Sequence, residues 1–129
     1  MPKIMNFPPP PHTFQRPPRV HFTDVTPAVV RFGDGQRSSG KLRVVSVSGG
    51  LLSLSRPVPR GSVARLLFVS VAGPILGTVE MLSPLFQGTQ PFRFVALYDD
   101  DETRLHAAIQ FSLDSHRRDQ QQIEKNRPW

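Results

Sequence analysis

The chain has 129 residues, 38% of them hydrophobic and 20% charged, which allows one folded domain with its own apolar core but not two. It contains no cysteine, which excludes a disulfide scaffold, thiolate metal sites and cysteine nucleophiles. The formal net charge of +6 is unevenly distributed: residues 1–98 carry 11 Lys and Arg against 3 Asp and Glu, and residues 99–129 carry 5 against 7. The body of the domain therefore suits an anionic partner.

The N-terminal segment is dominated by proline. Seven of the 14 prolines lie in the first 18 residues. Because proline fixes φ and lacks an amide donor, we expect a disordered, extended arm over residues 1–18 that joins no sheet. The sequence shows no secretory segment and no run of about 20 apolar residues. We therefore expect a cytoplasmic protein with no membrane insertion.

Between residues 26 and 98, apolar residues cluster in short β-rich runs that glycines and prolines interrupt. This pattern is typical of an all-β fold and predicts a barrel or sandwich without parallel βαβ units. The order of the runs favours antiparallel pairing of strands that follow one another in the chain. The expected strands cover residues 28–32, 40–47, 51–55, 63–71, 75–82 and 92–97.

After Tyr98 the hydrophobic period becomes helical, which predicts one long amphipathic helix over about residues 100–122, followed by a tail at 123–129. The carboxylates at 99–102 lie where a helix exposes unpaired N–H groups, so they are interpreted as a helix start and not as a cation site. Phe111 lies off the apolar stripe, so it either packs on a strand edge or on the arm, or is exposed and available to a partner. The stripe should close one side or mouth of the barrel; it consists of Leu105, Ala108, Ile109, Ser112, Leu113, His116 and Ile123.

The sequence offers no support for catalysis, so we predict no catalytic residue, metal site or cofactor. The four histidines have no metal-ligand spacing: they are His12, His21, His106 and His116. Nucleophile-elbow, phosphate-loop and dinucleotide-binding motifs are absent. The protein is predicted to be a binding protein and not an enzyme.

Two segments stand out as candidate binding motifs. Gln15-Arg16-Pro17-Pro18-Arg19 precedes the first strand, and Ser46-Val47-Ser48-Gly49-Gly50-Leu51 joins the second strand to the third. Together with six strands, the strand at 91–97 and a following helix, they resemble the PilZ domain family over about residues 15–115. The fold that this resemblance implies is a six-stranded antiparallel β-barrel with one C-terminal helix, here over residues 19–122.

The resemblance also implies binding of cyclic di-GMP, a bacterial second messenger with two phosphodiesters and two guanines. An arginine can fork onto guanine O6 and N7 or onto phosphate oxygens, and a Ser-Gly-rich turn lets backbone donors come close to a ligand. The partner would be cyclic di-GMP, with output to motility, secretion or polysaccharide machinery through protein contact. The implied ligand-binding residues are Arg16, Arg19, Ser46, Ser48, Gly49 and Gly50.

Both motifs depart from the family pattern of Arg-x-x-x-Arg and Asp/Asn-x-Ser-x-x-Gly. Gln15 stands where the first arginine is expected if Arg19 is the second, and Ser46 replaces the acid or amide. Gly50 follows Ser48 by two positions, whereas the family pattern has three. Each lost charge removes a charge-assisted hydrogen bond, so we predict weak binding of cyclic di-GMP.

Two other functions stay open. The first is a degenerate PilZ-like adaptor that binds a protein partner and no nucleotide, which an exposed Phe111 would favour. The second is an RNA- or single-strand-binding barrel, which fits the cationic body. The chain holds one Tyr and one Trp, which leaves little stacking platform for bases, so this function ranks last and no DNA partner is expected.

Overall fold

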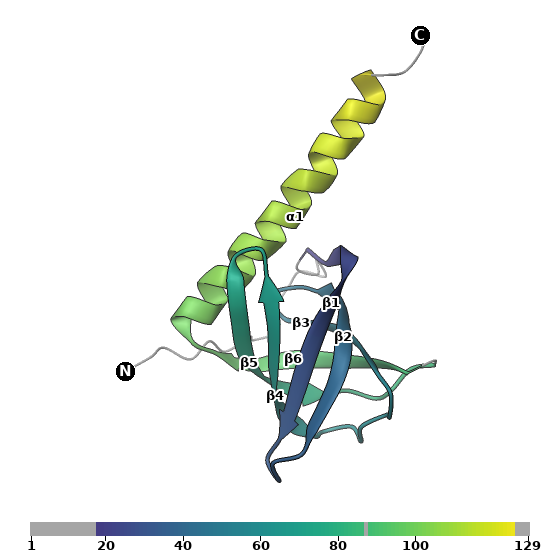
Figure 1. Ribbon diagram of the computed structural model, residues 1–129, viewed down its shortest axis with the longest axis vertical. Coiled ribbons are helices and arrows are strands. Elements are labelled where there is room, and N and C mark those ends of the chain that lie inside the picture. The colour runs from purple at the N-terminus through teal and green to yellow at the C-terminus, as the bar shows by residue number, and fades with distance from the viewer. Residues whose placement is uncertain (1–17, 87, 126–129) are drawn as a thin grey trace, which may run out of the picture.

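The computed structural model describes the backbone of residues 18–86 and 88–125, and the side chains of all of them except residues 21–25 and 116–125. These residues form six strands and one helix, as the sequence predicted (Figure 1). The predicted arm at 1–18 falls almost entirely outside them. The elements are β1 (Val20–Phe32), β2 (Arg37–Val45), β3 (Gly49–Leu54), β4 (Val63–Ser70), β5 (Gly73–Met81), β6 (Thr89–Leu97) and α1 (Asp99–Lys125).

The strands form a closed barrel in the order β1-β2-β3-β6-β5-β4, and every neighbouring pair is antiparallel. The expectation that strands pair in chain order is wrong at one step, because β3 pairs with β6 while β4 pairs with β1. The connection from β3 to β4 joins strands that are not neighbours and must cross the end of the barrel. Its two prolines, Pro57 and Pro59, disfavour a tight hairpin there.

Strand β1 begins at Val20, well before the predicted start at residue 28. Residues 20–27 were not predicted as a strand, because this segment contains Pro27 and does not alternate regularly between apolar and polar residues. The pairing with β2 is irregular between His21 and Thr26, and pairing with β4 starts only at Ala28. Pro27 therefore lies where the second neighbour has not yet joined, so its missing amide is tolerated.

The barrel interior is filled by alternate residues of all six strands, including Leu42, Leu52, Leu66, Phe68 and Phe94. Helix α1 covers part of this core with Leu105, Ala108 and Ile109, which are all buried, and Leu113 packs against it. The docking role predicted for the apolar stripe is confirmed for these four residues. The side chains of His116 and Ile123 lie outside the described ones. Figure 1 shows the C-terminal half of α1 extending away from the barrel.

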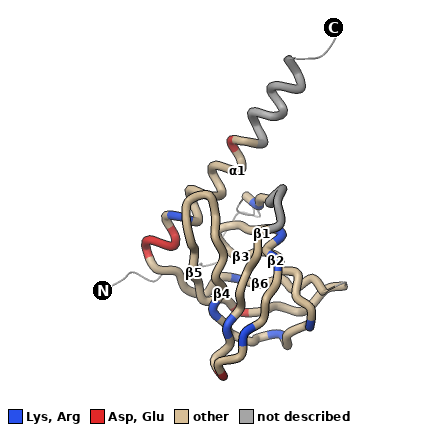
Figure 2. Tube along the Cα trace, viewed as in Figure 1, with Lys and Arg blue, Asp and Glu red and all other residues tan. Residues whose placement is uncertain are grey.

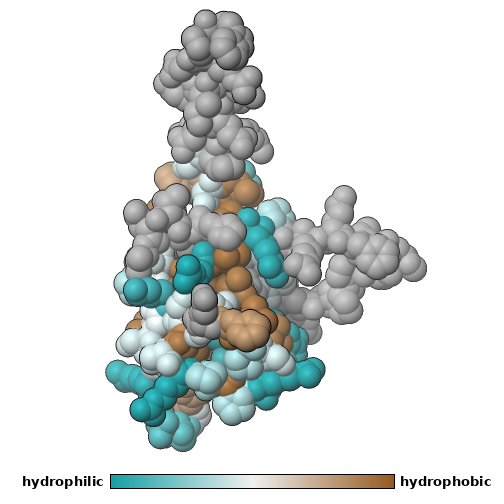
Figure 3. Space-filling model, turned by 90° about the vertical axis from the view of Figure 1, so that its right-hand side faces the viewer, coloured by the Kyte–Doolittle hydropathy of each residue, from teal (hydrophilic) through white to brown (hydrophobic). Residues whose placement is uncertain are grey.

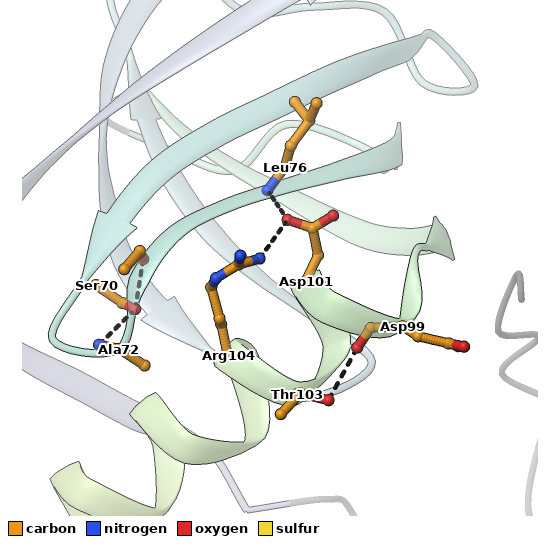
Figure 4. Close-up of polar contacts among 8 residues, drawn as sticks. Ser70, Ala72, Leu76, Asp99, Asp101, Thr103 and Arg104 are labelled. Carbon is orange, nitrogen blue, oxygen red and sulfur yellow. Dashed lines mark hydrogen bonds and ion pairs between the residues drawn. The ribbon is translucent and has the colours of Figure 1, made fainter. Parts of the chain in front are cut away.

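The first turn of α1 is tied to β5 by a polar contact (Figure 4). The Asp101 carboxylate accepts a hydrogen bond of 2.9 Å from the Leu76 amide and lies 3.7 Å from the Arg104 guanidinium. Pairing of β5 with β6 begins at Gly77, so the Leu76 amide has no partner on that strand. Asp101 supplies the missing acceptor and thereby fixes where the helix leaves the sheet.

No helix within the described residues is long and apolar enough to cross a membrane.

Gln90 holds the crossing loop to the end of the barrel. Its side chain is only 1% exposed. Its Oε1 accepts a hydrogen bond of 3.0 Å from the Val58 amide, and its Nε2 donates one of 2.6 Å to the Leu82 carbonyl. One buried amide thus connects the β3–β4 loop, the end of β5 and the start of β6.

Replacing Gln90 by Leu should therefore lower the free energy of unfolding by about 1–3 kcal/mol, because it leaves a half-buried donor, the Val58 amide, and a half-buried acceptor, the Leu82 carbonyl, without their partner. Urea unfolding followed by circular dichroism would measure the change. Gln110→Leu, on the exposed face of α1, is the matched control and should shift stability by less than about 0.5 kcal/mol. Equal effects of the two substitutions would contradict the role of Gln90.

Candidate functional site

The structure brings Arg19 and the β2–β3 turn (Ser46, Val47 and Ser48) to the same end of the barrel. Val20 pairs with Val45, so the residue before β1 and the residue after β2 are neighbours across this pair. Arg19 is exposed there. Arg16 lies outside the described residues.

The side chain of Ser46 is used within the turn itself. It is only 3% exposed. Its Oγ accepts a hydrogen bond of 3.2 Å from the Ser48 amide and donates one of 3.3 Å to the Gly49 carbonyl, and it lies 3.1 Å from the Ser48 Oγ. This is the local side-chain turn that Ser, Asp and Asn all favour. Ser46 therefore shapes the turn, and Ser48, which is half-buried, is the hydroxyl nearer the surface.

Gly49 and Gly50 belong to strand β3, whereas the sequence placed them in the turn and started the strand at Leu51. A Cβ on Gly49 would collide with the carbonyl oxygen of Phe92, and one on Gly50 with that of Val44. Both glycines are therefore required by the close approach of neighbouring strands. Gly49 lets the turn lie tightly against β6.

The turn is also anchored to β6. The Ser48 carbonyl accepts a hydrogen bond of 2.9 Å from the Phe94 amide, and the backbone Ser46 amide donates one of 2.7 Å to Gly49. Phe92 and Phe94 meet edge to face beneath it, with ring centroids 5.4 Å apart. The turn therefore has a preorganised backbone on a packed aromatic support.

The fold adds one further cation beside the turn that sequence reasoning missed, because Arg93 pairs in register with Gly49. Arg43 of β2 instead donates a hydrogen bond of 3.1 Å to the Ser53 hydroxyl, toward the other end of β3. Arg93 Nε donates a hydrogen bond of 2.7 Å to Glu80, which holds the pKa of that carboxyl below its ordinary value. Alternation in 91–97 would have shown Arg93 facing outward, but its position beside the turn depends on the β3–β6 pairing.

A metal centre has no support in the described part of the chain. Among the side chains of residues 18–20, 26–86 and 88–115, no three His, Asp or Glu gather in an arrangement that could hold a metal ion. What the site presents is one exposed arginine and a rigid serine turn, with Arg93 nearby and paired with Glu80. Such an arrangement suits a phosphate or guanine edge.

Comparison with known proteins gives matches at the level of structure alone. No family model matches the sequence, and no curated protein does. The YcgR structure from Escherichia coli in complex with c-di-GMP superposes with a TM-score of 0.66 and 19% identity, covering 88% of this chain and 51% of that one. This chain thus spans about half the length of the YcgR chain.

Isolated PilZ domains match over nearly their whole length. The PilZ domain of YcgR from Escherichia coli, with c-di-GMP, has a TM-score of 0.60 and 13% identity, covering 84% of this chain and 98% of that one. The PilZ domain of CeSA from a cellulose-synthesizing bacterium has a TM-score of 0.55 and 16% identity, with 74% and 97% covered. These likenesses establish the fold: the barrel with its C-terminal helix is a PilZ fold, which confirms the predicted architecture.

Proposed function

We propose that this chain is a cyclic di-GMP-binding signalling module, a binding protein and not an enzyme, which works in the bacterial cytoplasm and acts through protein contacts. The observation that carries the proposal is the adjacency of Arg19 and the β2–β3 turn, in a fold that also occurs in structures solved with c-di-GMP. Arg16 lies three residues before Arg19 and adds a second cation to the same segment.

The chemistry of the site fits a cyclic dinucleotide. The Arg19 guanidinium can fork onto a phosphate or onto guanine O6 and N7. Ser48 offers a hydroxyl on a turn whose backbone is already ordered, so little entropy is lost there on binding. The Ser46 hydroxyl is occupied within the turn, so it brings neither a charge nor a free acceptor to a guanine N–H. We therefore expect an affinity in the micromolar range or poorer.

Calorimetric titration with cyclic di-GMP tests this proposal, and a gain-of-function variant sharpens it. Gln15→Arg restores the arginine spacing of the PilZ pattern and should tighten binding about tenfold or more, since a charge-assisted hydrogen bond contributes roughly 1.5–3 kcal/mol. Gln36→Arg adds the same charge on the exposed β1–β2 hairpin at the other end of the barrel and should change the affinity less than about twofold. Absence of heat from wild type and Gln15→Arg at millimolar nucleotide would contradict the proposal.

The alternative is an adaptor that binds a protein partner and no nucleotide. Phe111 favours it, because this large apolar side chain is 56% exposed on α1, which is one of the two placements that the sequence left open. Further exposed apolar side chains are Leu85 and Phe86, and Figure 3 shows hydrophobic surface in a band down one face of the molecule. Such surfaces are typical of protein contacts. The same titration separates the two functions, and the PilZ resemblance suggests motility, secretion or polysaccharide machinery as the partner in either case.

A further inference from the structure

Three arginines lie in lateral register on the outer face of the barrel. Arg31 of β1 pairs directly with Arg37 of β2 on one side and with Arg65 of β4 on the other. All three are exposed, and Figure 2 shows Lys and Arg positions on the neighbouring strands β2, β1 and β4, at the end of the barrel away from α1. Arg37 begins β2, whose other end leads into the β2–β3 turn, about 27 Å away at roughly 3.4 Å per residue. We call this set the arginine row.

The arginine row is unfavourable for the isolated domain. Like charges directly opposite each other on neighbouring strands destabilise a sheet. Among the described side chains, the ion pairs involve other residues: Arg93 with Glu80, Arg104 with Asp101 and His106 with Glu102. The nearby Asp34 is engaged locally, where its carboxylate accepts a hydrogen bond from the Gln36 amide. The row therefore presents a concentrated positive charge with no described counter-charge bound to it.

A second row, of apolar side chains, lies beside the arginine row, two residues away from it along β1 and β4. Val29 of β1 pairs directly with Leu67 of β4, and these side chains are 39% and 41% exposed. Leu76 continues the row onto β5. Neighbouring rows on one face of a sheet lie about 7 Å apart. The surface thus combines a line of cations with a parallel line of half-exposed aliphatic side chains.

From this pairing of rows we propose that the outer face of β2, β1 and β4 is a docking surface for an acidic amphipathic helix of a protein partner. Adjacent strands place successive guanidinium groups about 5 Å apart. Carboxylates at positions i and i+4 of a helix have Cβ atoms about 5–6 Å apart, so a helix lying across the strands presents its acids at matching intervals. Its neighbouring apolar stripe would then cover Val29 and Leu67.

Two features favour a helix over other occupants. Around both rows β1 and β4 pair with each other, β1 also pairs with β2 and β4 with β5, so neither strand has a free edge there for an added strand. Neither row contains an aromatic side chain, so nucleic-acid bases lack a stacking platform here. The same lack removes the aromatic anchors that proteins commonly use at a membrane interface. The proposal is independent of cyclic di-GMP, because the arginine row and the β2–β3 turn lie at opposite ends of the barrel.

Fluorescence anisotropy with a synthetic peptide tests the proposal. The probe is a helical peptide of about 20 residues, with glutamates at every i and i+4 position of one stripe and leucines on the next. Wild type should bind it about tenfold or more tightly than an isomeric peptide whose glutamates are scrambled. Arg31→Glu should weaken binding at least about tenfold, while Arg56→Glu, an exposed loop position with the same change in net charge, should weaken it less than about threefold.

Folding and alternative partners are controlled in the same series. Arg31→Glu should melt at the same temperature as wild type or higher, because it replaces two repulsions by two attractions, and its titration with cyclic di-GMP should match that of wild type. Equal binding of the ordered and scrambled peptides, or equal losses from Arg31→Glu and Arg56→Glu, would overturn the proposal. So would Arg31-dependent binding of phosphatidylserine vesicles or of a single-stranded RNA in the absence of peptide binding.

Discussion

Replacing Ile109 by Asp should lower the free energy of unfolding by at least about 3 kcal/mol. Ile109 is 5% exposed and packs in the core cluster that the strands and α1 share. Truncating a buried isoleucine alone costs about 2–5 kcal/mol, and a carboxylate without a partner adds its desolvation penalty. Thermal and urea unfolding at pH 7 would measure the loss.

The same helix supplies a matched control for this substitution. Phe111 lies two positions further along α1 and is 56% exposed, so Phe111→Asp should change stability by no more than about 0.5 kcal/mol. Burial raises the pKa of a carboxyl, so the penalty of Ile109→Asp is complete above that raised pKa and should shrink as the pH falls through it. A melting curve unchanged by Ile109→Asp would show that α1 is not docked on the barrel.

Replacing Arg19 by Ala should reduce the affinity for cyclic di-GMP by about tenfold to a hundredfold. Arg19 is exposed and immediately precedes β1, beside the β2–β3 turn. Loss of one charge-assisted contact, worth roughly 1.5–3 kcal/mol, accounts for a change of this size at 1.4 kcal/mol per decade. Calorimetric titration of both proteins at one salt concentration gives the ratio.

Two controls show whether Arg19→Ala lowers the affinity through a loss of stability or through the change in net charge. Because Arg19 lies outside the strands, Arg19→Ala should leave the melting temperature unchanged. Arg56→Ala removes the same charge from the exposed β3–β4 loop and should leave the affinity within about twofold of wild type. Equal measurable affinities of wild type and Arg19→Ala would remove Arg19 from the site, and absence of binding by both would leave the adaptor.

Local patterns in the sequence were sufficient for most elements of the fold. Strands β4 and β5 are runs rich in apolar residues that a glycine turn separates, and their observed bounds fall close to the predicted ones. The helix was predicted from a change of period, and it runs from Asp99 to Lys125, slightly longer than expected. These elements were predictable because each depends on the spacing of neighbouring side chains.

The candidate site was only partly predictable for a related reason. The sequence identified Arg19, Ser46 and Ser48, and the barrel places them at one end. It misassigned Gly49 and Gly50 to the turn, because their requirement comes from the approach of Phe92 and Val44 on other strands. Whether any of the six proposed residues contacts a nucleotide stays a prediction.

Thus the residues by themselves determined the class of fold, the number of strands and the amphipathic helix, since periodicity and turn residues act within a few positions of the chain. Tertiary structure decided which strands meet. The pairing of β3 with β6 places Arg93 beside the turn, and the pairing of β1 with both β2 and β4 aligns the arginine row. Such contacts join residues far apart in sequence, and they arise because closing the barrel satisfies the backbone hydrogen bonds of every strand while burying one apolar core.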